Sequence, residues 1–217
     1  MRFSKMLNES DRGRSIMFVD IDETTFKTFS MIKVMKDGEE VTRLDNKEFN
    51  AYKLGDGESF DFSEFRDAAL FKQTSKPIRK MLDKLKAMMG NNAKIVFLTA
   101  RADFDNKDIF LDSFRQLGMD PEKFYVERAG TLKRGSIPER KMYIILKKYL
   151  STGLYRRAYI YDDFIPNCTD FLALKDKIPE ETLNTIRKVN NITDPNETVI
   201  TFQAYEVLED GSIKEVK

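Results

Sequence analysis

The chain has 217 residues, of which 41% are hydrophobic and 34% charged, with a formal net charge of +1 and no histidine. This length allows a substantial apolar core, and the near-neutral charge gives no general attraction to nucleic acid or to a membrane surface. The absence of histidine excludes Ser-His-Asp and Cys-His triads, histidine-ligated zinc and histidine phosphotransfer. Proton transfer therefore falls to Asp, Glu, Lys or Tyr.

A single cysteine, Cys168, excludes an internal disulfide and fits a reducing compartment. No apolar run approaches membrane-spanning length, and the polar residues 1–14 lack the apolar segment of a signal peptide. We therefore expect a cytoplasmic protein, in the host cytoplasm if the chain is viral, with no membrane partner.

The first predicted strand, residues 16–19, is a short apolar run that ends abruptly at Asp20. Residues 32–44 predict a β-hairpin, because Asp37-Gly38 suits a type I′ turn between alternating apolar residues. A polar stretch with scattered aromatic residues follows. We expect these rings to fill the core under a long loop, with substrate stacking as the alternative: Phe49, Tyr52, Phe60, Phe62 and Phe65.

Helices and strands alternate along the rest of the chain. The patterns predict helices over 77–89, 106–117, 136–150, 166–177 and 179–190, and strands over 94–98, 124–126 and 157–161. This order predicts an α/β fold with a doubly wound, mostly parallel sheet. We expect a single domain over residues 1–217, with a hairpin flap or small cap inserted at about 28–75.

Residues 198–217 predict a strand and a hairpin that turns at Asp210-Gly211. The sequence leaves open whether this C-terminal hairpin extends the sheet, covers the site or mediates assembly.

Polar side chains follow three of the predicted strands. Because the carboxyl ends of parallel strands meet at one edge of a sheet, we expect these residues to converge. A lysine at the start of the helix before the third strand has the reach to join them, and a lysine in the preceding loop is the alternative. The residues are Asp20 and Asp22, Thr99 and Arg101, Asp162 and Asp163, with Lys141 or Lys133 as the lysine.

Clustered carboxylates allow two kinds of chemistry. Neighbouring like charges raise the pKa of one member, which suits a nucleophile beside a general acid. Carboxylate oxygens also bind hard cations such as Mg²⁺. Two capping roles compete with these interpretations: Thr99 is equally suited to capping a helix, and Asp162-Asp163 can cap the next helix. An acidic pair that ends an apolar strand is a weak cap, so we favour metal binding there.

Four segments resemble the motifs of the haloacid dehalogenase (HAD) superfamily of phosphotransferases, over roughly residues 15–170. They are DIDET at 20–24, LTAR at 98–101, Lys141, and YDD at 161–163. The resemblance implies that Asp20 is a nucleophile that forms an aspartyl-phosphate, and that Asp22 is the general acid and base. It implies Mg²⁺ held by Asp20, the backbone carbonyl of Asp22 and Asp162, with Asp163 close by or acting through water. Thr99, Ala100 and Lys141 are then the phosphate-binding residues.

The resemblance also narrows the reaction. The second aspartate of the first motif is absent from dehalogenases, so Asp22 implies phosphomonoester hydrolysis. Arg101 after the second motif resembles the phosphatase domain of phage polynucleotide kinase-phosphatase and several nucleotidases. We therefore expect Arg101 to bind substrate, and the substrate to be a phosphorylated small molecule, such as a nucleotide, or a nucleic-acid end.

Several alternatives remain at this stage. The basic residues Lys133, Arg134, Arg140, Arg156 and Arg157 are either phosphate-backbone contacts or solvated surface. The short insertions leave the site lightly covered, which suits a large substrate or a homo-oligomer in which another subunit covers it. A catalytically silent HAD fold, kept as a phosphate-binding or assembly module, is the alternative to an enzyme.

Overall fold

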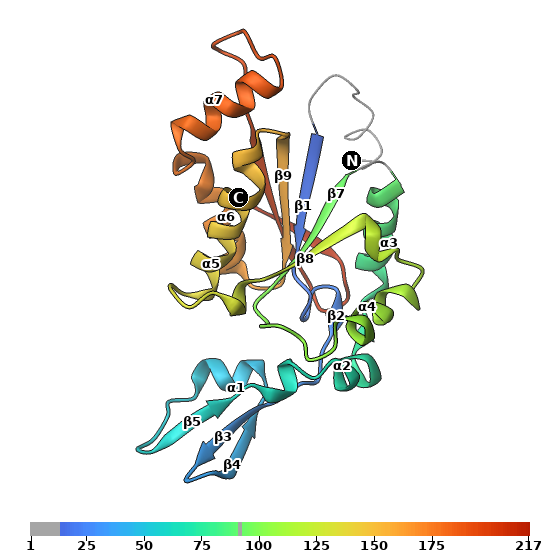
Figure 1. Cartoon of the computed structure of the whole chain (residues 1–217), viewed down its shortest axis with the longest axis vertical. Coiled ribbons are helices and arrows are strands. Elements are labelled where there is room, and N and C mark those ends of the chain that lie inside the picture. The colour runs from blue at the N-terminus through green and yellow to red at the C-terminus, as the bar shows by residue number, and fades with distance from the viewer. Residues whose placement is uncertain (1–13, 91–92) are drawn as a thin grey trace.

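A computed structural model describes residues 14–90 and 93–217, so the sequence-based expectations for residues 1–13 and 91–92 lie outside the described chain. At its centre is a six-stranded sheet in the order β11-β10-β9-β1-β7-β8 (Figure 1). Neighbouring strands pair in parallel except β11, which is antiparallel to β10. The predicted α/β fold with a mostly parallel sheet is thereby confirmed. The strands are β1 (Arg14–Val19), β7 (Lys94–Thr99), β8 (Phe124–Arg128), β9 (Tyr155–Asp162), β10 (Thr201–Val207) and β11 (Ile213–Val216).

Helices cover both faces of this sheet. In β1, Met17 and Val19 pack into the apolar core on one face, whereas Ile16 and Phe18 pack into the core on the other. Burial on both faces explains why the strand is an unbroken apolar run instead of an alternating one. The first face carries α3 (Arg79–Gly90) and α4 (Lys107–Arg115), and the second carries α5 (Ile137–Ile144), α6 (Ile165–Leu172) and α7 (Glu180–Val189).

The helices predicted over 136–150 and 77–89 have different bounds in the structure. After α5 the chain continues as a π-helical turn over Ile145–Tyr149 and a 3₁₀ turn over Leu150–Thr152, and Gly153 stops it at a φ of 75°. The helix predicted to begin at Pro77 begins at Arg79, because Pro77 lies in the short strand β6 (Lys76–Pro77), which pairs with β2 (Phe26–Lys27).

A second, smaller sheet lies beyond the carboxyl ends of the central strands (Figure 1). It consists of β3 (Ile32–Lys36), β4 (Glu39–Leu44) and β5 (Glu58–Asp61) in the order β4-β3-β5. Asp37 and Gly38 both have positive φ, as a type I′ turn requires, and the predicted pairing of residues 32–44 is confirmed.

The small sheet has its own apolar cluster. Rings of Phe49, Tyr52, Phe60 and Phe65 pack against Ile32, Val34 and Leu44, so these four fill a core as predicted. Phe62 was predicted to do the same, but it is 44% exposed and contacts the cluster only from outside. Beside the cluster lie three short elements that the sequence analysis did not predict: α1 (Asn46–Ala51), a 3₁₀ turn (Ser63–Phe65) and α2 (Ala68–Thr74).

The C-terminal hairpin extends the central sheet. β10 pairs in parallel with β9, and β11 adds the last strand. Gly211, at the turn, has a φ of 77°, and a Cβ atom there would lie 2.6 Å from a methyl carbon of Ile78. The turn therefore packs closely against the start of α3. Every helix in the described part of the chain is too short or too polar to cross a membrane.

Candidate functional site

The strand order brings the predicted residues to one edge. β1 lies between β7 and β9 in the sheet. Asp20 directly follows β1, and its N–H donates a 2.9 Å hydrogen bond to the carbonyl of Tyr161 on β9. The strand pairing thus continues to the first acid and places Asp20 between Thr99, the last residue of β7, and Asp162, the last residue of β9.

Lys141 lies inside this edge. Its Nζ atom is 2.7 Å from Oδ1 of Asp20 and 2.8 Å from Oδ2 of Asp162, and the side chain is almost fully buried. Ser136 and Glu139 form a capping box at the start of α5, which fixes where the helix begins and so where Lys141 projects. Of the two lysines left open by the sequence, Lys141 is the one at the site. Lys133 is exposed in the preceding loop.

One oxygen each from Asp20, Asp162 and Asp163, hereafter the acid cluster, lies within 4.8 Å of the other two. Thr24 holds Asp163, because its hydroxyl donates to Asp163 Oδ1 at 3.1 Å and accepts the Asp163 N–H at 2.9 Å. Converging carboxylate oxygens are the ligand type that Mg²⁺ and Ca²⁺ prefer. The acid cluster therefore fits a divalent cation, as the sequence predicted for these three residues.

Asn167, in the first turn of α6, holds one member of the acid cluster, Asp162, by hydrogen bonds. Its Nδ2 donates to both carboxylate oxygens of Asp162 at 2.9 Å. Its Oδ1 is buried and has no hydrogen-bond partner among the described residues. A buried oxygen without a donor is costly unless water or another polar partner reaches it.

The acid cluster contains more acidic than basic groups, and this imbalance shifts the pKa values of its members. Burial raises the pKa of Asp20 well above its usual value, and Asp162 and Asp163 add to the rise while Lys141 opposes it. Partial burial and the neighbouring Asp162 raise the pKa of Asp163 to about 7. Burial alone would lower the pKa of Lys141, but Asp162 and Asp20 raise it above the ordinary lysine value. Three carboxylates thus share one ammonium group, and a bound cation would relieve their repulsion.

Asp22 takes no side-chain part in the acid cluster and instead pairs with Arg101. The guanidinium Nε lies 3.0 Å from both carboxylate oxygens, and Nη2 lies 2.7 Å from Oδ1. Thr28 donates a further hydrogen bond to Oδ1 at 2.8 Å. Burial raises the pKa of Asp22, but Arg101 and Thr28 together lower it by more, so the net pKa lies below the usual value. We call this pair the Asp22–Arg101 clamp.

Arg101 is itself buried, at 3% exposure. Its guanidinium donates to the carbonyl of Phe65 at 2.9 Å and to the hydroxyl of Ser30 at 3.3 Å. Ser30 and Phe65 belong to the two segments that lead into and out of the small sheet. Three rings surround the guanidinium, with centroids at 4.7, 5.2 and 5.4 Å: Phe65, Phe71 and Phe104. The structure therefore shows Arg101 in contact with Asp22 and with the segments on either side of the small sheet, and its binding of substrate stays a prediction.

Thr99 and Ala100 lie beside the clamp. The Thr99 hydroxyl is buried, accepts the backbone N–H of Arg101 at 3.1 Å and lies 3.4 Å from Asp22 Oδ2. Asn106 caps α4, so the capping role considered for Thr99 is wrong. Ala100 is exposed. A Cβ atom on Gly130 would lie 2.3 Å from the Ala100 carbonyl, so the loops after β7 and β8 are in close contact.

Sequence reasoning missed four of the supporting side chains: Thr24, Thr28, Ser30 and Asn167. Asn167 had a usable signal, because an amide in the first turn of a helix that follows a strand-ending Asp-Asp points back toward that strand end. No sequence signal marked Thr28 or Ser30, because only the path of the chain after β2 brings them to the Asp22–Arg101 clamp.

No family model, curated protein or solved structure matches this chain. The function is therefore inferred from the residues and their geometry.

Proposed function

We propose that the chain is a Mg²⁺-dependent phosphomonoester hydrolase of the HAD type, with a doubly wound core and the small sheet as its flap. Its nucleophile is Asp20, and its substrate is a nucleotide or a nucleic-acid end. The observation that carries the proposal is the convergence of Asp20, Asp162 and Asp163 within 4.8 Å at the carboxyl edge of a parallel sheet, where Lys141 bridges Asp20 and Asp162.

The residues present fit a magnesium ion. The three carboxylates of the acid cluster supply hard oxygen ligands, and the backbone carbonyl of Asp22 is the fourth candidate. When bound, Mg²⁺ supplies positive charge that stabilises the phosphoryl oxygens during transfer.

The chain's own carboxylates account for the covalent steps. An Oδ atom of Asp20 forms a bond to phosphorus while the bond from phosphorus to the ester oxygen breaks, and Asp22 donates a proton to the departing alkoxide. Water then attacks the phosphorus of the aspartyl-phosphate and gives a proton to Asp22. The bond to Asp20 breaks, and inorganic phosphate is released with both aspartates restored.

The Asp22–Arg101 clamp affects the protonation state of Asp22, and so its role as general acid and base. An ionised Asp22, as the lowered pKa describes, is ready to accept the proton of the hydrolytic water. Donation to the alkoxide requires a protonated Asp22, and an incoming phosphate dianion favours that state because a nearby negative charge raises a carboxyl pKa. Arg101 then acts as a positioning residue that keeps Asp22 in one orientation, while Thr99 and Lys141 bind phosphoryl oxygens.

One observation favours the alternative of a catalytically silent phosphate-binding or structural module. Lys141 already bridges Asp20 and Asp162, and Arg101 already neutralises Asp22. Buried ion networks of this kind also occur where no reaction takes place.

Hydrolysis of p-nitrophenyl phosphate separates the two functions. We expect turnover with Mg²⁺, and background rates with EDTA or with Asp20→Asn. The exposed Asp176, which lies after α6, provides a matched control, and Asp176→Asn is expected to keep the wild-type rate. Equal background rates for every protein and condition would make the silent module the better account.

A further inference from the structure

β8 forms one edge of the central sheet. In the described part of the chain, no strand pairs with its outer side. The strand is regular, because its five residues, Phe124–Arg128, pair with β7 without a shift in register. The backbone N–H and C=O groups on its outer side are therefore available to a further strand.

The two edges of the central sheet differ in how they discourage such pairing. Charged residues, proline and bulges keep edge strands from joining other chains. β11, at the other edge, has the exposed charges of Lys214 and Glu215 at its centre. The middle of β8 is instead Tyr125 and Val126, and Tyr125 is 52% exposed. β8 is thus the edge that is better suited to strand addition.

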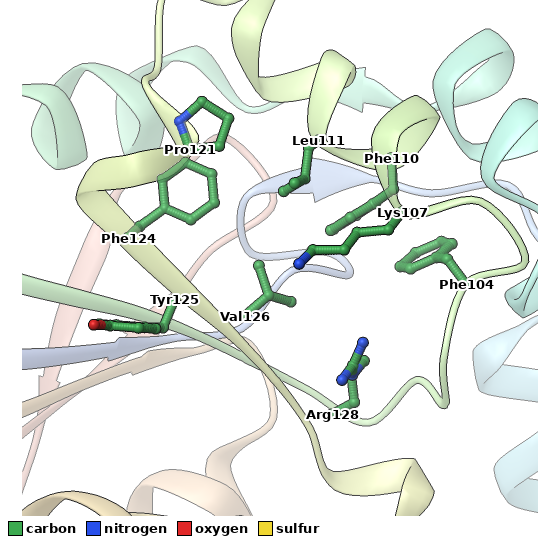
Figure 2. A pocket seen from close by; sticks show the side chains of 9 residues that line it. All are labelled: Phe104, Lys107, Phe110, Leu111, Pro121, Phe124, Tyr125, Val126 and Arg128. Carbon is green, nitrogen blue, oxygen red and sulfur yellow. The ribbon is translucent and has the colours of Figure 1, made fainter.

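Space for added side chains lies along this edge. A hollow of about 200 Å³ between α4 and β8 is lined by residues from both faces of the strand, Tyr125 on one face and Val126 and Arg128 on the other (Figure 2). The hollow therefore follows the outer edge of β8. A strand that pairs with this edge has room there for its own side chains.

β8 is complementary to a second copy of itself. In an antiparallel pair centred on Val126, this residue faces its counterpart and every residue of β8 has a partner. Tyr125 then faces Glu127, and Phe124 faces Arg128, so no like charges meet. A pair centred on Glu127 would bring two carboxylates directly opposite each other, which is destabilising. A pair centred on Tyr125 would leave Glu127 and Arg128 outside the paired strands.

Charge also favours the pair centred on Val126. The ammonium group of Lys94 lies over the ring of Tyr125, 3.4 Å from its centroid. Because Tyr125 faces Glu127 of the second copy, this ammonium group lies near a carboxylate across the interface. Opposite charges on neighbouring strands stabilise a pair, and two-fold symmetry forms this contact twice.

We propose that β8 pairs with β8 of a second copy, antiparallel and centred on Val126, so that two six-stranded sheets join into one. This inference does not depend on the proposed function. Because the paired strands run in opposite directions, the two acid clusters lie at opposite edges of the joined sheet. Neither copy contributes a residue to the candidate site of the other.

An extended segment of a different protein is the competing occupant, because strand addition relies mainly on backbone hydrogen bonds. Such a segment would leave the chain monomeric by itself. The match between Lys94 and Glu127, and the absence of like charges when β8 pairs with itself, favour the second copy.

Disulfide cross-linking tests the register of the pair. Cys168 is buried, so a cysteine introduced into β8 is the accessible thiol. Opposite residues of an antiparallel pair have Cα atoms about 4.5–5.5 Å apart, which a disulfide can span. We therefore expect Val126→Cys to form a covalent dimer under mild oxidation. In Tyr125→Cys the two cysteines would lie about 8 Å apart, beyond the reach of a disulfide, and should not cross-link.

Val41→Cys is the matched control for cross-linking. Val41 is an exposed valine of β4, an edge strand of the small sheet, and its cysteine variant should stay monomeric.

Sedimentation equilibrium tests the association without a cross-link. A single pair of short strands forms a small interface, so we expect the wild-type chain to dimerise with a Kd of about 10 µM. Val126→Lys places two ammonium groups opposite each other at the two-fold axis and should weaken the dimer at least about tenfold. Val41→Lys, the same substitution at an exposed strand position, should leave the Kd unchanged.

The outcomes decide the proposal. A wild-type chain that stays monomeric well above the expected Kd would overturn it. A dimer that Val126→Lys leaves intact, or that cross-links through Tyr125→Cys or Val41→Cys in preference to Val126→Cys, would overturn the assigned interface. If Val126→Lys does not fold, cross-linking of Val126→Cys still decides. Hydrolysis of p-nitrophenyl phosphate tests only the proposed function, because each copy holds a complete candidate site.

Discussion

Two buried ionic groups lie side by side at the carboxyl edge of the central sheet, and they differ in balance. In the acid cluster three carboxylates share Lys141, and the pKa of Asp20 is raised. In the clamp one carboxylate meets one guanidinium in a two-pronged contact, and the pKa of Asp22 is lowered. The two aspartates are separated by one residue, and burial raises the pKa of both, but their neighbours differ: Arg101 and Thr28 reverse the shift at Asp22, whereas Asp162 and Asp163 add to it at Asp20.

This difference indicates different roles for the two groups. A bound cation stabilises a cluster in which carboxylates outnumber basic groups, but it does not stabilise a pair of one carboxylate and one guanidinium. We therefore expect Mg²⁺ to act on the acid cluster and the clamp to serve orientation, both of Asp22 and of the small sheet. The predictions below test this contrast, in decreasing order of effect.

The largest effect is expected for Lys141→Met. Removing the cation from a buried pair leaves uncompensated carboxylates and should lower the free energy of unfolding by about 3 kcal/mol or more in EDTA. Mg²⁺ should restore part of this loss because it replaces the missing positive charge. Urea denaturation with and without Mg²⁺ measures both effects. Lys148→Met, which removes the largely exposed partner of Glu127, is the control and should change little. A loss that Mg²⁺ leaves unchanged would contradict the unbalanced cluster.

A double-mutant cycle of Asp22→Asn and Arg101→Met tests the clamp. Because the pair is buried and two-pronged, we expect a coupling free energy of about 2 kcal/mol from urea denaturation, with the same value in Mg²⁺ and in EDTA. The exposed pair of Lys72 and Asp112 provides the matched cycle, with a coupling near zero. A clamp coupling that changes with Mg²⁺ would mean that the two groups do not act separately.

A smaller effect is expected at Asn167, which supports Asp162 without contributing a carboxylate. Asn167→Leu keeps the size of the side chain and removes both hydrogen bonds to Asp162. Loss of a supporting partner of this kind typically weakens metal affinity 10- to 100-fold, and we expect about tenfold by calorimetric titration with Mg²⁺. Asn184→Leu, on an exposed part of α7, is the control. Unchanged Mg²⁺ affinity in the Asn167 variant would place the cation away from Asp162.

The sequence predicted the central sheet because burial leaves a direct pattern. Strands β1, β7 and β9 contain apolar runs bounded by polar residues. β7 ends at Thr99, β9 ends at Asp162, and Asp20 directly follows β1. The topology rule for parallel sheets then placed Asp20, Thr99 and Asp162 on one edge without any coordinates. Lys141 followed from its place in the helix before β9, although its choice over Lys133 required the structure.

Features without a periodic pattern were not predictable. β5 is a short strand of mixed polarity, Glu58–Asp61, whose pairing with β3 is a long-range contact. The burial of Arg101 depends on rings from three separate segments, and arginine is rarely buried, so its contacts could not be predicted from its sequence position. The direction of the Asp22 pKa shift follows from that same unpredicted contact.

The central claim is that Asp20 receives the phosphoryl group while the neighbouring carboxylates hold Mg²⁺. Acid quenching during turnover of p-nitrophenyl phosphate, followed by borohydride reduction, converts an aspartyl-phosphate into homoserine, which peptide mass spectrometry locates. We predict homoserine at position 20, dependent on Mg²⁺ and absent with EDTA. Homoserine at position 22 or 162, or phosphate release with no modified aspartate, would contradict the account.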